Sequence, residues 1–102
     1  MAPFRVQQVA LALTPEVISL CGALPVELRS QVRRAMVSVA LNIAEGGGRA
    51  GRDRQHHVPI AYASAREVSA GLEIGAAITG MDVGAAEAKL DRVRAMRWRL
   101  SR

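Results

Sequence analysis

Aromatic residues are scarce in this chain of 102 residues, which has one Phe, one Tyr and one Trp although half of its residues are hydrophobic. The core must therefore be built from Ala, Val, Leu, Ile and Met, and an alanine-rich core favours closely packed helices. No stretch alternates apolar and polar residues over the length of a strand. The composition predicts one all-α domain spanning residues 1–102, a length typical of a single domain.

Cysteine and long hydrophobic runs are also nearly absent. Cys21 has no partner for an intramolecular disulfide, so nothing points to an oxidising compartment, and we interpret it as a small buried hydrophobe. The most apolar run, residues 35–44, is about half the length of a membrane-spanning helix. No signal peptide is evident. These absences favour a cytoplasmic protein.

Positively charged residues outnumber negatively charged ones in this chain. The formal net charge is +5, and thirteen of the fourteen basic residues are arginine. The planar guanidinium suits phosphate better than the point charge of lysine does. The balance therefore favours an acidic partner, of which nucleic acid is the first to consider.

Glycine and proline divide the chain into four apolar segments with short connections. The expected helices span about residues 5–22, 26–45, 53–79 and 83–100. Asp82 is expected to cap the last of these helices. Four helices of similar length with short connections predict an antiparallel up-down-up-down four-helix bundle.

Prolines and glycines inside these segments predict local irregularities. Thr14-Pro15-Glu16 has the pattern of an N-cap followed by proline at the first helical position, so the first helix should be kinked at Thr14 or split there. Pro59 should bend the third helix or delay its start. Gly71 and Gly75 share one face of that helix, where they permit close approach of a neighbour.

The second helix carries a narrow polar stripe, because polar residues recur at spacings of three and four. The stripe consists of Gln31, Arg34, Ser38, Asn42 and Glu45. We interpret it as a structural set of paired groups in or near a buried seam. Arg34 would then pair with Glu45 of a neighbouring helix or with Glu67, because a buried charge needs a partner.

The same helix has more apolar surface than one core-facing side requires. One interpretation makes it the buried centre of the bundle, and the other assigns one apolar face to the core and a second face to a subunit interface. A helix of a four-helix bundle buries about one face, which favours the second interpretation. The predicted homo-oligomer interface is Val37, Leu41 and Ala44.

Two basic clusters are candidates for nucleic-acid contacts. Arg49, Arg52 and Arg54 follow the triple glycine at residues 46–48, and the last helix contributes Arg92, Arg97 and Arg99. In an up-down bundle both clusters should lie at one end of the molecule. The first cluster is either a solvated turn or a phosphate-binding patch, and the second interpretation predicts RNA or DNA binding.

Residue patterns typical of catalysis are missing. His56 and His57 are adjacent, so on a helix they point about 100° apart and do not easily face one ion. A bundle-type di-iron centre requires Glu-x-x-His pairs, and the sequence contains none. Ser38 has no histidine within helical reach. The sequence therefore predicts no catalytic residue, no metal and no cofactor.

The second helix and the turn after it resemble the signature of a bacterial four-helix-bundle family. The matching residues are Gln31-Val32-Arg33-Arg34-Ala35, Ser38-Val39, Asn42-Ile43-Ala44-Glu45-Gly46 and Gly48-Arg49. The family includes proteins encoded in intervening sequences of 23S ribosomal RNA genes and, as a related branch, the accessory variability protein of diversity-generating retroelements. The resemblance covers about residues 5–100. The chain departs from the family at Ala40, where proline is usual, and at residues 56–59, where aromatics are usual.

This resemblance implies an antiparallel four-helix bundle that assembles into a homopentameric barrel. For the retroelement branch it also implies a basic surface that binds nucleic acid and a partner reverse transcriptase. Residues and resemblance together predict a non-enzymatic, homo-oligomeric module that binds RNA or DNA. The alternative is a structural assembly protein that binds another protein and has no nucleic-acid role.

Overall fold

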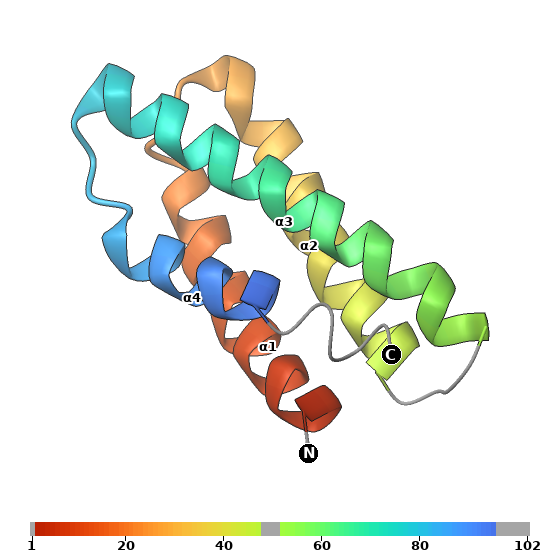
Figure 1. The fold of residues 1–102 in the computed structure, drawn as a ribbon. Helices are drawn as coiled ribbons and strands as arrows, with labels where there is room; N and C mark the ends of the chain where they lie inside the picture. Colours follow the sequence, from red (N-terminus) through yellow and green to blue (C-terminus); the bar gives the residue numbers. More distant parts are fainter. Residues whose placement is uncertain (1, 48–51, 96–102) are drawn as a thin grey trace.

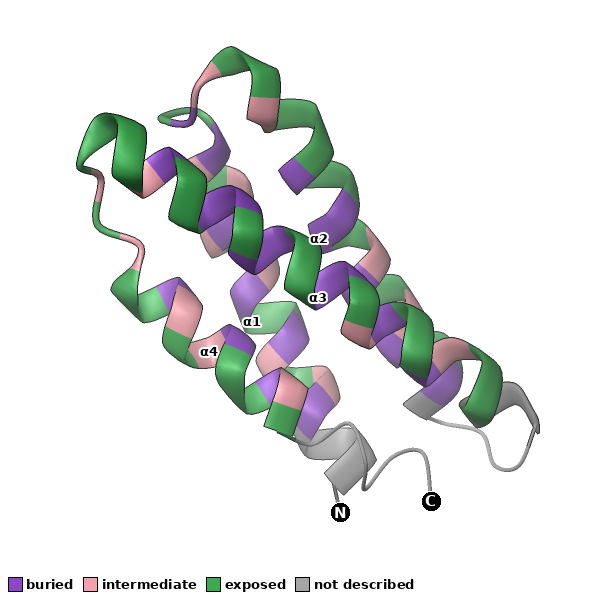
Figure 2. Cartoon of the chain, turned by 45° about the horizontal axis from the view of Figure 1, so that its top comes forward, coloured by how far each residue is buried: buried purple, intermediate pink, exposed green. Residues whose placement is uncertain are grey.

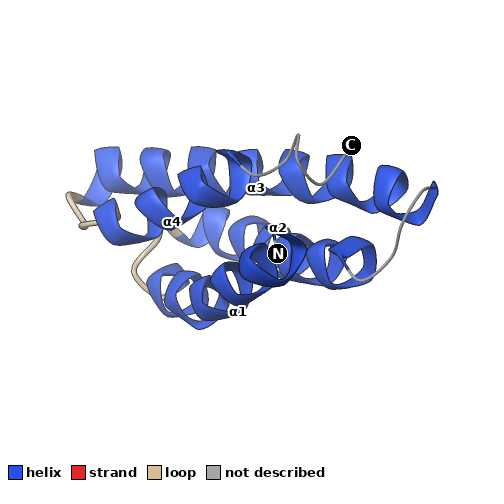
Figure 3. Cartoon of the chain, turned by 60° about the horizontal axis from the view of Figure 1, so that its bottom comes forward, coloured by secondary structure: helices blue, strands red, loops and turns tan. Residues whose placement is uncertain are grey.

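A computed structural model describes residues 2–47 and 52–95, with side chains described for residues 6–46 and 55–95. It contains four helices, α1 (Ala2–Cys21), α2 (Val26–Gly47), α3 (Arg52–Thr79) and α4 (Gly84–Ala95). Short loops join them within the described ranges, which contain no strand (Figure 3). The prediction of an all-α, four-helix fold is confirmed.

Successive helices run in opposite directions along an elongated bundle (Figure 1) that measures 42 × 20 × 18 Å. Neighbouring pairs are α1 with α2, α2 with α3, α3 with α4, and α4 with α1, so α1 lies diagonally across from α3. The contact between α2 and α3 is the most extensive. No helix among the described residues is both long and apolar enough to cross a membrane.

The core of the described bundle contains no aromatic side chain. Buried residues line the inner sides of all four helices (Figure 2), and the largest of them are Leu13, Leu24, Met36, Ile43, Leu72 and Leu90. Val, Ala and Cys21 fill the remaining space. Because these side chains are small and flexible compared with aromatic rings, the helices can approach closely along their length.

Of the two alternatives for the first helix, a kink or a split at Thr14, the split is excluded, since α1 continues through Pro15. The hydroxyl of Thr14 donates to the carbonyl of Ala10 at 2.7 Å, as it does inside a helix, and forms no N-cap. Proline at position 15 leaves the carbonyl of Leu11 without a helical donor. Leu11 and Pro15 are both exposed, so water can satisfy that carbonyl and the helix continues.

Pro59 likewise does not delay the start of α3, which begins at Arg52. Pro59 is exposed, and so is Gln55, whose carbonyl loses its helical partner. The second helix also extends further than predicted, through Gly46 and Gly47. Glycine permits a left-handed stop but adopts the helical backbone as well, so the glycines alone do not set the helix end.

The predicted ends around the last turn are confirmed where the structure describes them. Gly80 has φ 76°, the left-handed conformation that ends many helices, and its amide donates to the carbonyl of Ala76 at 2.8 Å. The carboxylate of Asp82 accepts a hydrogen bond from the amide of Gly84 at 2.9 Å, as an N-cap does. Residues 96–100 of the predicted last helix lie outside the described residues.

Gly71 and Gly75 permit a close approach between α3 and the chain around the start of α2. A β-carbon at position 71 would collide with Cγ2 of Val32, and one at position 75 would collide with Cδ2 of Leu24. Both partner side chains are buried. The predicted role of this glycine pair in helix packing is therefore confirmed.

Substituting the two glycines should have unequal effects. Val32 is β-branched and stiff, so Gly71→Ala should push α2 and α3 apart and lower the free energy of unfolding by about 1–3 kcal/mol. Leu24 meets position 75 with the end of a flexible side chain, so Gly75→Ala should cost less. Urea unfolding measures both. Gly22→Ala, where the nearest atom is 3.6 Å away, is the control, and a Gly71→Ala variant as stable as the wild type would contradict the packing argument.

Candidate nucleic-acid interface

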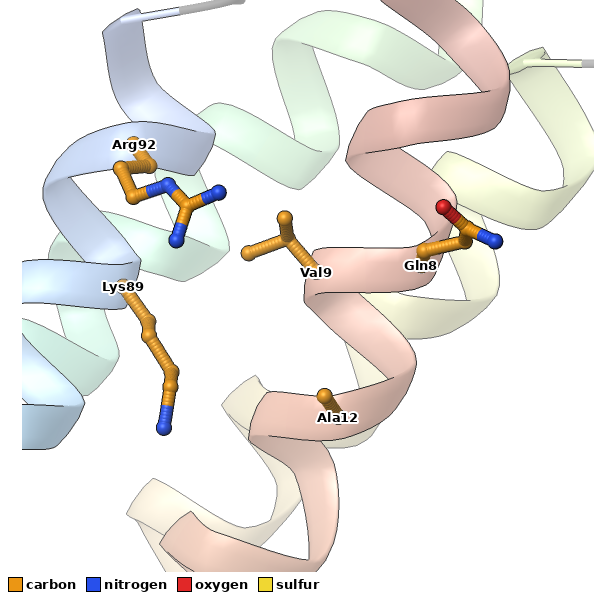
Figure 4. Close-up of a pocket in the computed structure, with 5 residues that line it drawn as sticks. All are labelled: Gln8, Val9, Ala12, Lys89 and Arg92. Carbon is orange, nitrogen blue, oxygen red and sulfur yellow. The ribbon is translucent and has the colours of Figure 1, made fainter.

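The basic residues of α4 differ in their ionic partners. Lys89 donates to the carboxylate of Glu16 on α1 at 2.5 Å, and Arg94 pairs with Asp91 one turn earlier. Among the described residues Arg92 has no carboxylate partner. It is exposed and lies at a hollow between α1 and α4 (Figure 4), lined by Gln8, Val9, Ala12, Lys89 and Arg92. Arg92 is thus the cation of described α4 that is available to an anion.

The other predicted nucleic-acid contacts are only partly described. Arg49, Arg97 and Arg99 lie outside the described residues, and the side chains of Arg52 and Arg54 do as well. The backbone places Arg52 and Arg54 in the first turn of α3, at the far tip of the α2/α3 pair (Figure 1). The described part of α4 ends beside α1, so the described residues do not themselves bring the two basic clusters together.

A chain of polar side chains crosses the seam between α2 and α3. The hydroxyls of Ser38 and Ser64 are 2.8 Å apart, and the amide nitrogen of Asn42 donates to the carbonyl and to the hydroxyl of Ser38 at 2.9 and 3.2 Å. The amide oxygen of Asn42 lies 2.9 Å from Nδ1 of His57. Two of the five residues of the predicted polar stripe, Ser38 and Asn42, therefore belong to a structural network between two helices.

The same network determines which nitrogen of His57 carries a proton. Because the carbonyl of Ser38 can only accept, the amide group of Asn42 must turn its nitrogen toward Ser38 and its oxygen toward His57. An amide oxygen accepts hydrogen bonds, so Nδ1 of His57 must donate.

The other three residues of the predicted stripe are exposed in the single chain. Gln31, Arg34 and Glu45 lie on the outer side of α2. The contacts of Ser38 with Ser64 and of Val32 with Gly71 put Arg34 at about the same level as Glu67, but no ion pair joins these two described residues. Arg34 is therefore exposed and does not pair with Glu67, because the stripe curves from the α3 seam toward solvent. The alternative, a pair with Glu45 of a neighbouring helix, stays a prediction.

The second apolar face of α2 is uncovered. Val37 and Leu41 are 49% and 56% exposed, and Ala44 beside them is exposed as well. Together with α1 they line an open groove, formed by Leu11, Thr14, Val37, Ala40, Leu41 and Ala44. The predicted interface residues therefore form one continuous apolar surface that nothing in the described chain covers.

Comparison with protein families gives one match for this four-helix chain. The model of the family described as 23S rRNA-intervening sequence protein matches residues 3–100. The chain belongs to the 23S rRNA-intervening sequence protein family. No curated protein and no solved structure matches the chain. The resemblance noted in α2 and the turn after it is thus confirmed for the ribosomal RNA branch, while the retroelement branch gains no support.

The two regions in which this chain departs from the family pattern can now be located in the structure. Ala40, where the family usually has proline, lines the apolar groove between α1 and α2. His57 lies in the segment, residues 56–59, where aromatics are expected from the family resemblance. It bonds to Asn42 across the α2/α3 seam, and His56 contacts its ring edge-on with centroids 4.9 Å apart. In this member of the 23S rRNA-intervening sequence family, that segment therefore contributes a polar bond to the α2/α3 seam.

Candidate metal ligands do not cluster in the part of the chain that the structure describes. No group of three or more His, Cys, Asp or Glu among these residues could hold a metal ion. Cys21 is 4% exposed, as predicted for a small buried hydrophobe. Burial raises the pKa of its thiol, while the charge of nearby Arg33 acts in the opposite direction.

The carboxyl group of Glu87, which lies between α4 and α3, has an environment that was not predicted from the sequence. Oε1 accepts a hydrogen bond from the hydroxyl of Ser69 at 2.7 Å, and Oε2 is buried without a partner among the described residues. Burial is the largest cause that raises the pKa of Glu87, and the charge of Glu73 adds to it. Asp91 on the same helix also raises the pKa. The burial and the contacts with Ser69 and Glu73 depend on another helix, so the sequence around Glu87 does not show them.

Glu87 should make stability depend on pH. Because its pKa is raised in the fold, the folded state binds a proton more tightly than the unfolded chain does. Its contribution should be fully present below about pH 4.3, the ordinary glutamate pKa, and be lost as pH rises through the raised value. Glu87→Gln should therefore raise Tm at neutral pH and flatten this part of the profile. Glu67→Gln, on the exposed side of α3, is the control, and a lower Tm for Glu87→Gln at neutral pH would refute the assignment.

Proposed function

We propose that this chain is a non-enzymatic homo-oligomer, a pentamer, whose basic surface binds RNA or DNA. The observation that carries the self-association is the exposed apolar groove between α1 and α2. The basic net charge and the unpaired Arg92 support the nucleic-acid role. Membership in a family of proteins encoded within ribosomal RNA genes is consistent with an RNA partner without identifying one.

The groove supports self-association because large apolar side chains are costly to leave in water. Leu11, Val37 and Leu41 are about half to two-thirds exposed and lie along one groove. Contiguous exposed apolar surface rimmed by polar groups is typical of interaction sites. Another copy of the same chain is present wherever the protein is made, so it is the simplest occupant of the groove.

A second apolar surface supports a closed ring over a simple pair. Ile60, Ile74 and Ile78 of α3 are 38%, 50% and 65% exposed, and α3 lies diagonally across from α1. The α3 surface and the α1/α2 groove therefore face in different directions. Two different patches on each subunit make a head-to-tail contact, which closes into a ring when its rotation allows. Among such rings, a pentamer is the one that the family resemblance implies.

Nucleic-acid binding is supported by arginines without a carboxylate partner. Arg92 has none among the described residues, whereas Lys89 and Arg94 are neutralised locally. A ring would repeat each basic cluster in every subunit and so concentrate positive charge on one face. Phosphate contacts release counterions, so binding should weaken steeply with salt and show little sequence preference.

The oligomer predicts a mass of about five times the 10.9 kDa of the chain in light scattering. Leu41→Glu places a charge in the apolar groove, and it should give monomers whose far-UV helicity is largely unchanged, because position 41 is exposed in the single chain. Val26→Glu is the matched control, since Val26 is exposed on the same helix but outside the groove. A wild-type protein that is monomeric at micromolar concentration would overturn the oligomer.

The nucleic-acid role predicts a measurable salt slope. Fluorescence anisotropy with labelled RNA and DNA should give a slope of log affinity against log salt that falls by about 0.7–0.9 for each phosphate contact removed. The variant Arg52→Ala/Arg54→Ala tests the first cluster, and adding Arg49→Ala extends it. Arg34→Ala/Arg66→Ala removes the same charge from exposed positions outside both clusters.

Two results would replace the nucleic-acid role with the structural assembly alternative. One is a wild-type protein that binds neither polymer at low salt. The other is a salt slope that is the same for the wild type, the cluster variant and the control variant. The cluster arginines would then be solvated and would not contact phosphate. Loss of affinity in the control as large as in the cluster variant would also count against the proposed contacts.

A further inference from the structure

A hollow of about 400 Å³ lies between the end of α1 and the first turns of α2. This volume is in the range of small-molecule sites. The side chains and backbone that line it are those of Ile18, Ser19, Cys21, Gly22, Arg29, Ser30 and Arg33. It is distinct from both predicted basic clusters, and it contains two arginines that no predicted site includes.

The two arginines are placed together by one turn of α2. Positions 29 and 33 are four residues apart, so they lie on the same side of the helix. Nε of Arg29 donates to the carbonyl of Leu24 at 2.8 Å, which uses one of its five N–H donors and holds the guanidinium at the hollow. Arg33 reaches the same hollow next to Cys21, where its charge is felt by the thiol.

The charge of this hollow is not neutralised by the protein. No carboxylate lines it, and neither Arg29 nor Arg33 has an ion-pair partner among the described residues. Two like charges on one helix side destabilise each other slightly unless an anion lies between them. Ser19 and Ser30 also line the hollow, and a serine hydroxyl can donate a hydrogen bond to a phosphate oxygen.

We propose that this hollow, formed by Arg29, Arg33, Ser19 and Ser30, binds the terminal phosphate of a small phosphorylated ligand. Two guanidiniums match the double negative charge of a phosphomonoester better than the single charge of a phosphodiester. The forked guanidinium also matches the oxygens of a phosphate in pairs. The site is independent of the proposed function, since it uses neither the apolar groove nor either basic cluster.

Arginine-selective NMR of the full chain tests the site directly. The Nε–H of Arg29 is hydrogen-bonded to a carbonyl, so it should exchange slowly enough to be observed. Titration with inorganic phosphate and with adenosine 5′-monophosphate, at ionic strength held constant with chloride, should shift this signal, that of Arg33 and the amides of Ser19 and Ser30. Constant ionic strength removes general screening as a cause.

Variants separate a built site from general basicity. Arg33→Gln should weaken phosphate binding about tenfold or more, because a hydrogen bond to a charged group is lost. Arg33→Lys keeps the charge but not the fork and should give an intermediate loss. Arg66→Gln removes one charge from an exposed position on α3 and should bind as the wild type does. Arg33 is exposed, so none of these changes should unfold the chain.

Three outcomes would overturn the site. The first is no shift with millimolar phosphate or nucleoside monophosphate, and the second is equal binding by Arg33→Gln and the wild type. The third is binding at the hollow of an oligonucleotide that lacks a terminal phosphate, with no binding of either small probe. Loss of nucleic-acid binding in the Arg52/Arg54 variant with retained phosphate shifts at the hollow would leave this site intact.

Discussion

The close packing of α3 on α2 at Gly71 and Gly75 is the contact on which the rest of the bundle depends. Where Val32 and Leu24 enter the space that a side chain on α3 would occupy, the two helices are held at one separation and one register. That register places Ser38 opposite Ser64 and Asn42 opposite His57. A shift of α3 by one residue would rotate these polar groups away from one another, and the buried parts of the seam would lose their hydrogen bonds.

The same packing decides what α2 leaves to solvent. Because its inner side packs in the core and one flank packs on α3, Val37 and Leu41 remain uncovered. Along the seam with α1, the lining changes from arginine and serine near Arg29 to apolar side chains near Leu41. One seam of the bundle therefore presents two surfaces of different chemistry, one suited to anions and the other to apolar partners.

The periodicity of the helices predicted much of the candidate site, but it did not predict which of its charged residues form ion pairs. Spacing along α2 identified Ser38 and Asn42 as a polar pair and Leu41 as part of a second apolar face, since both depend only on helical geometry. It did not show that Arg34 turns to solvent while Ser38 turns to α3, because the two differ by a modest rotation around the helix. The pairing of Lys89 with Glu16 joins residues far apart in the sequence, and only the fold brings them together.

The sequence by itself determined the helical class, the absence of aromatic side chains from the described core and the helix ends at Gly80 and Asp82, because composition and capping act over a few residues. The tertiary structure decided whether prolines break their helices. Pro15 and Pro59 are tolerated because they and the residues whose carbonyls they deprive of partners are exposed, so water can satisfy these carbonyls, and exposure is a property of packing. The tertiary structure likewise decided the environment of Glu87, whose buried oxygen and raised pKa arise from contact with a different helix.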